Sequence, residues 1–155
     1  MNHNTPWRIL MIGLVACIAA QASGTGARAA YIGGTLSKVA NNTSGSIDAI
    51  DEKYFVFYAR HESIRVPYER ISIVEYGQKV DRRYLEAILI SPLFLIAKRR
   101  SHFLTIGYVD SQGRQQAVVL EVEKGDIRQL LVSLEARTGR RVEYQDEEAR
   151  KAGKG

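Results

Sequence analysis

The fold class of this chain is decided by residues 102–123, which read HFLTIGYVDSQGRQQAVVLEVE. Two runs rich in β-branched and aromatic residues flank the turn SQGR, an arrangement typical of a β-hairpin. Apolar residues of the next segment, 126–138, recur at i, i+3, i+4 and i+7, which predicts an amphipathic helix. Asp126 and Gln129 give this helix a capping-box pattern, and Gly139 supplies its C-terminal stop.

Upstream of this hairpin, the sequence predicts further antiparallel strands in succession. Residues 54–59, YFVFYA, are apolar on both faces of a strand and indicate a central strand. Residues 64–76 predict a bent strand, or two strands joined at Pro67, because proline lacks the amide donor of a strand interior. Shorter strands are predicted over 31–39 and 46–50. We therefore expect a mainly β fold, a small antiparallel barrel or sandwich of about six to seven strands closed by one C-terminal amphipathic helix.

Four features of this order resemble a known fold: the opening Gly33-Gly34-Thr35-Leu36, the aromatic strand Tyr54–Tyr58, the corner IRVPYERI at 64–71, and the closing helix at 126–138. Together they resemble the pleckstrin-homology-like superfold, particularly its bacterial and GRAM-like members. The resemblance covers residues 31–144 and implies a module that binds lipids, peptides or proteins and does not catalyse a reaction. The chain departs from this pattern between Tyr76 and His102, where a short turn is expected.

The first 29 residues have the pattern of a signal peptide for export. Residues 9–20 form an uninterrupted apolar run, which is shorter than the about 20 residues that a membrane-spanning helix needs. Ala27-Arg28-Ala29 is a small-x-small pattern, which predicts cleavage after Ala29. Cys17 follows Leu14-Val15-Ala16 in a sequence that resembles a bacterial lipobox, so the alternative is a lipoprotein anchored through Cys17. Both interpretations place the protein outside the cytoplasm, in the periplasm or the cell envelope.

We expect three parts: a signal peptide over 1–29, a β domain over 30–144, and a polar, disordered tail over 145–155. Removing Arg8 and Arg28 with the leader leaves 20 of the 22 basic residues against 17 acidic ones. Residues 79–100 alone hold six basic and two acidic residues. Since the positive charge is this local, a nucleic-acid-binding surface is not predicted.

Residues 79–100, here called the insert, are the unusual element of the β domain. Its centre, Tyr84–Ala97, reads YLEAILISPLFLIA and lies between two basic clusters. It could cover an open end or face of the barrel, enter a lipid interface while its cations meet anionic headgroups, or bind a partner protein. The predicted membrane or partner contacts are Arg82, Arg83, Leu93, Phe94, Leu95, Lys98, Arg99 and Arg100.

The sequence contains none of the motifs that identify the common enzyme and metal sites. HExxH, CxxC, GxSxG and Walker-type glycine loops are all missing, and His61 and His102 lie beside charged residues at strand ends. We therefore predict no catalytic, metal or cofactor-binding residues and a non-enzymatic binding or scaffolding module. The alternative is a small exported hydrolase or a barrel for a hydrophobic ligand, with His61 or His102 buried beside a carboxylate and a serine.

Overall fold

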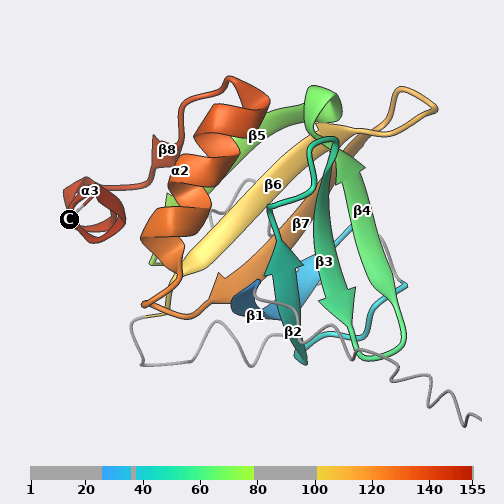
Figure 1. Cartoon of the computed structure of the whole chain (residues 1–155), viewed down its shortest axis with the longest axis horizontal. Helices are drawn as coiled ribbons and strands as arrows, with labels where there is room; N and C mark the ends of the chain where they lie inside the picture. The colour runs from blue at the N-terminus through green and yellow to red at the C-terminus, as the bar shows by residue number, and fades with distance from the viewer. Residues whose placement is uncertain (1–25, 36–37, 79–100, 155) are drawn as a thin grey trace, which may run out of the picture.

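The described residues, 26–35, 38–78 and 101–154 of this computed structural model, form one sheet of eight strands with the order β4-β3-β2-β1-β7-β6-β5-β8 (Figure 1). The strands are β1 Ala27–Gly34, β2 Thr43–Asp48, β3 Tyr54–Ala59, β4 Ser63–Pro67, β5 Ile71–Gly77, β6 Phe103–Val109, β7 Gln115–Val122 and β8 Glu143–Tyr144. The helices are η1 Tyr68–Arg70, α2 Ile127–Thr138 and α3 Glu147–Lys154. The mainly β fold with a C-terminal helix is confirmed.

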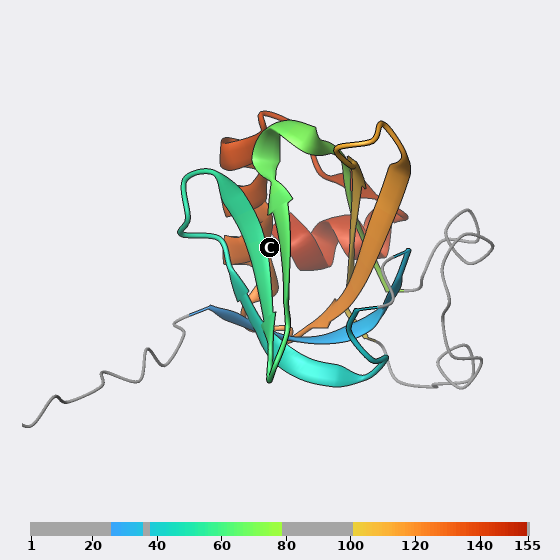
Figure 2. The same cartoon turned by 90° about the vertical axis from the view of Figure 1, so that its right-hand side faces the viewer.

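The sheet consists of two antiparallel meanders, β1–β4 and β5–β7, which join where β1 pairs with β7. It bends strongly, so that β3 and β4 lie opposite β6 and β7 (Figure 2). The described residues add two details to the expected antiparallel barrel or sandwich with one C-terminal helix. The sheet is open and is mixed, because β8 adds to β5 in parallel, and α3 is a second C-terminal helix.

The corner at Pro67 divides residues 64–76 into two strands, as its missing amide donor predicts. Strand β4 ends at Pro67, the single turn η1 follows, and β5 begins at Ile71. Tyr68 marks the end of the β3–β4 ladder, since its N–H donates to the carbonyl of Lys53 over 3.0 Å. The corner thus ends the first meander and begins the second.

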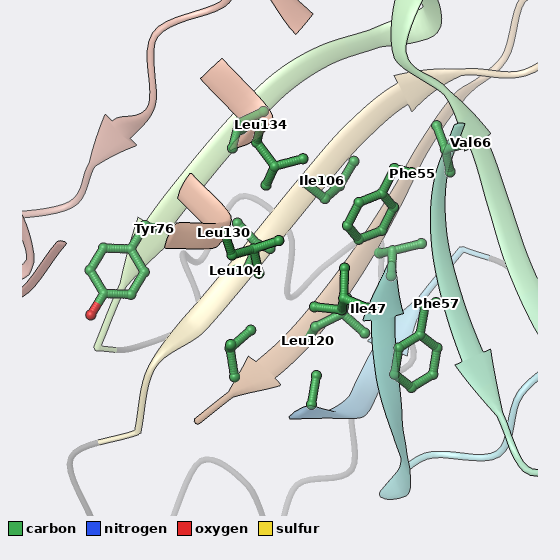
Figure 3. Close-up of a cluster of buried hydrophobic side chains, with 14 of the residues drawn as sticks. Ile47, Phe55, Phe57, Val66, Tyr76, Leu104, Ile106, Leu120, Leu130 and Leu134 are labelled. Carbon is green, nitrogen blue, oxygen red and sulfur yellow. The ribbon is translucent and has the colours of Figure 1, made fainter. Parts of the chain in front are cut away.

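The main core fills the space between the inner face of the bent sheet and helix α2 (Figure 3). The predicted stripe of α2, Ile127, Leu130, Leu131 and Leu134, is buried in the same cluster as Phe57. Burying large apolar side chains of this kind stabilises a fold by about 1.5–3 kcal/mol each. Helix and sheet therefore share one core.

The two ends of α2 differ in how well the sequence predicts them. Gly139 adopts the left-handed conformation with φ 66°, and its N–H donates to the carbonyl of Glu135, as a C-terminal stop requires. At the other end the capping box is wrong, because among the described residues the Asp126 side chain caps no helical N–H. The Asp126 carboxylate instead accepts the backbone N–H of Arg28, over 2.9 Å.

A second buried cluster lies on the opposite face of the sheet, over β1, β6 and β7. It comprises Ile32, Phe103, Ala117 and Val119. On the same face, two polar residues are almost fully buried, namely Glu75 and the Thr105 that pairs with it across β5 and β6. This part of the sheet is therefore buried on both faces.

The expectation of a disordered tail over 145–155 is wrong, because residues 147–154 form helix α3. The helix begins where the N–H of Ala149 donates to the Asp146 carboxylate over 2.7 Å. Gly153 allows close packing, since a Cβ there would come within 2.7 Å of the Tyr144 ring. The sequence of this segment is polar and does not indicate a packed helix, because the buried residues of α3 are the small residues Ala149 and Gly153. Across the described ranges, the helices are all too short or too polar to cross a lipid bilayer.

Candidate functional site

The strands on either side of the insert end as neighbours in the sheet. Gly77 at the end of β5 pairs with Phe103 at the start of β6. Phe103 pairs in turn with Glu121 of β7, and Glu121 pairs with Ala30 of β1. The N-terminal part of β1, the end of β5 and the start of β6 therefore lie at one end of the sheet (Figure 1).

The insert itself and its eight predicted contact residues lie outside the described residues, and so does Cys17. The described part of the chain shows only the base from which the insert leaves the sheet. This base is formed by the ends of β5 and β6 and by residues 101–102. The candidate site is therefore built from the base and the surface beside it.

A cleft of about 510 Å³ includes Ser101 and His102, the two residues that follow the insert in the sequence. It is lined by Arg28, Ala29, Ala30, Ser44, Gly45, Ser101, His102, Glu121, Val122, Glu123 and Lys124. Its charged residues carry both signs, and Arg28 already pairs with Glu123 at 2.6 Å. Charge alone thus favours neither an anionic nor a cationic ligand in this cleft.

Tyr76 and His102 form a stacked pair at the base of the insert. Their ring planes differ by 4° with centroids 5.9 Å apart, and the Tyr76 hydroxyl hydrogen bonds to His102 Nδ1. Burial raises the pKa of Tyr76 to about 12, so this hydroxyl keeps its proton and donates it. Burial, helped by the charge of Lys124, lowers the pKa of His102, so the imidazole is neutral and its Nδ1 accepts. The pair holds His102, the residue before β6, against Tyr76 near the end of β5.

The same pair weakens the hydrolase alternative. The cleft brings His102 near the serines Ser44 and Ser101 and the carboxylate of Glu121. Among the described residues, however, the hydrogen bond of His102 goes to Tyr76, and none joins it to a serine or a carboxylate. His61 is exposed in the β3–β4 turn and does not take part. A nucleophile and an oriented base are thus not assembled in the cleft.

Two further features concern ligands. In the described ranges, no group of three or more His, Cys, Asp or Glu side chains is placed to hold a metal ion. Tyr54 and Tyr58 of β3 are 37% and 44% exposed, and the Arg65 guanidinium lies 5.4 Å from the Tyr54 ring centroid. Sequence reasoning expected both faces of β3 to be covered. The missed signal is the pair of tyrosines four positions apart, which places both on one face of the strand. A tyrosine ring can be partly buried while its hydroxyl group contacts water, so this face is partly exposed.

No protein-family model matches this chain, and no curated protein matches it. The function is therefore inferred from the residues and their arrangement.

Proposed function

We propose that this chain is an exported, non-enzymatic binding module of pleckstrin-homology-like type that docks on an anionic membrane surface through the insert. The observation that carries the proposal is the row of paired residues Ala30, Glu121, Phe103 and Gly77. The leader precedes β1 at this end of the sheet, and the apolar insert departs from the same end.

The arrangement of strands supports the proposed fold type. Two antiparallel meanders joined between β1 and β7, followed by the amphipathic helix α2, have the element order that the resemblance implies. The long connection between β5 and β6 departs from that order, and β8 and α3 follow α2 as additions to it. Neighbouring antiparallel strands need only a two- to five-residue turn, so the sheet itself does not require the insert.

The composition of the insert supports a lipid surface as its ligand. Apolar residues at its centre can enter the boundary between headgroups and acyl chains. Each flanking Lys or Arg near an anionic membrane contributes about 1 kcal/mol, and the five cations of Arg82-Arg83 and Lys98-Arg99-Arg100 flank the apolar centre on both sides. The two contributions are separable, because salt screens only the second.

The test is co-sedimentation of the exported protein with vesicles of phosphatidylcholine, with and without phosphatidylglycerol. Leu93→Asp and Phe94→Asp should each reduce the bound fraction at least tenfold and leave the melting temperature nearly unchanged. The matched control is Val132→Asp, because Val132 is a 66% exposed apolar residue on α2 and should not matter for binding. Neutralising the five flanking cations should make the remaining binding insensitive to salt.

Three results would contradict this proposal. Wild-type protein that does not sediment with anionic vesicles at low salt would exclude membrane docking. A large fall in melting temperature for Leu93→Asp would mean that the insert covers part of the fold. Conversion of an oligomer to a monomer by the same substitutions would identify the insert as a protein interface.

A further inference from the structure

The first residues of β1 are built into the sheet on both sides. Ala27, Arg28 and Ala29 pair with Ile47, Ser46 and Gly45 of β2, and Ala29 also pairs with Val122 of β7. The side chain of Ala29 is 8% exposed and belongs to the main core. These three residues are thus part of an internal strand rather than an extension in front of the domain.

Arg28 also links β1 to the segment that leads into α2. Its N–H donates to the Asp126 carboxylate over 2.9 Å, and its carbonyl accepts the N–H of Glu123 over 3.0 Å. Its guanidinium lies 2.6 Å from a carboxylate oxygen of Glu123. Hydrogen bonds to charged groups are the stronger ones, so the bond from the Arg28 N–H to the Asp126 carboxylate and the Arg28–Glu123 ion pair join β1 to this segment.

The packing begins one residue earlier, at Gly26. A Cβ on Gly26 would come within 2.1 Å of the carbonyl oxygen of Ile47, so the backbone already lies directly against β2. Gly26 and Ala27 also line a cavity of about 150 Å³ between α2 and the β1–β2 end of the sheet. The folded domain therefore uses every residue from 26 onward up to Gly34.

Cleavage after Ala29 would remove residues that this fold needs. Signal peptidase acts on an extended segment during export, and the leader is then lost from the protein. The strand pairs of residues 27–29 and all the contacts of Arg28 would be lost with it. A cut that leaves the domain intact must lie before Gly26.

We infer that the precursor is cleaved after Ala22, so that the mature chain begins at Ser23; this rests on the export proposed above. Ala20-Gln21-Ala22 has small residues at both positions that signal peptidase reads, and it directly follows the apolar run. Ser23-Gly24-Thr25 then precede Gly26, the first residue that the structure describes. The structure thus selects between the two Ala-x-Ala patterns that the sequence offers.

The test is the intact mass of the exported product when the full-length precursor is expressed in a bacterial host. We expect wild-type product that begins at Ser23. Ala22→Leu should reduce the processed fraction at least tenfold, whereas Ala27→Leu should be processed normally. Ala27→Leu is the matched control, because it spoils only the downstream pattern and its side chain faces the 150 Å³ cavity.

Product that begins at Ala30, or processing blocked by Ala27→Leu, would overturn the inference in favour of the downstream pattern. Product with a lipidated Cys17, or with any start other than Ser23, would also overturn it. An exported product with another N-terminus contradicts only the cut. Precursor that remains unprocessed inside the cell contradicts both the cut and the proposed export.

Discussion

Strands β2–β4 and strands β5–β7 line the same core, but their outward faces differ. In the described residues, the exposed large hydrophobic side chains are Ile50 in the β2–β3 turn, Tyr54 and Tyr58 on β3, and Val132 on α2. The outward face of β1, β6 and β7 instead holds the second buried cluster, with Ile32 and Val119 fully buried. The outward face of β3 carries exposed large side chains, whereas the outward face of β1, β6 and β7 carries a buried apolar cluster.

The sequences of β7 and β3 account for this difference. Strand β7 is apolar at consecutive positions, AVVL, as is typical of a strand covered on both faces. Strand β3 is also apolar throughout, but its outward residues at both ends are tyrosines, whose hydroxyl groups tolerate water. The half from which the insert departs is thus also the half whose outward face holds the second buried cluster.

The largest expected effect compares one isoleucine in each half. Ile32→Ala removes a 0% exposed side chain from the second cluster and should lower the free energy of unfolding by about 2–4 kcal/mol. Ile50→Ala makes the same change at a 68% exposed position and should change stability by no more than about 0.5 kcal/mol. Urea titration of both variants gives the comparison. Equal losses would mean that the outward face of β1 is not buried in solution.

A smaller effect compares two glycines. A Cβ on Gly45 of β2 would lie 2.1 Å from the carbonyl oxygen of Tyr58, so Gly45→Ala must move backbone and should destabilise the protein by about 1–3 kcal/mol. A Cβ on Gly107 of β6 would meet nothing closer than 3.5 Å, so Gly107→Ala should stabilise the protein by about 0.5 kcal/mol. Thermal unfolding measures both. Destabilisation by Gly107→Ala would show that the outward face of β6 is more crowded than described.

The smallest effect is a pH dependence at the base of the insert. The pKa of His102 in the folded protein is lowered by burial, so protonation favours the unfolded state. The stability linked to His102 should be complete above its unfolded pKa of 6.5 and should be lost as the pH falls through the lower folded value. His102→Asn should remove this loss. Urea titrations at pH 7.5 and pH 5 check it, and an equal difference between variant and wild type at both values would contradict it.

Periodicity and turn residues were sufficient to predict most of the fold. The hairpin of residues 102–123, the corner at Pro67 and the buried stripe of α2 each follow from local patterns that tertiary structure leaves intact. Strand β3 also begins and ends at the residues expected from the sequence, 54 and 59. These elements could be predicted because the signal for each one lies in neighbouring residues: a turn between two apolar runs, a proline, or apolar residues at helical spacing.

The rest depended on contacts between distant residues. Tyr76 and His102 lie 26 positions apart, so their hydrogen bond left no local signal. Arg28 and Asp126 are 98 positions apart, and their bond replaced a cap that the local pattern favoured. The pairing of residues 27–29 with β2 also left no local signal, because a small-x-small pattern carries no information about strand pairing. The candidate site was hidden for the same reason, since its row of residues exists only in the register of the sheet.

The short strand β8 should limit self-association of this protein at high concentration. Open sheet edges are templates for edge-to-edge aggregation, and this sheet has two. At one edge, β8 occupies the backbone groups of Glu75 and Tyr76 on β5. At the other edge, the hydrogen bonds between β3 and β4 leave the backbone groups of Ser63, Arg65 and Pro67 pointing away from the sheet. This edge is a poor template for another strand, because Arg65 is charged and Pro67 has no N–H to donate. Deleting residues 143–155 should therefore promote fibrous or amorphous self-association through β5, while the β4 edge stays inert.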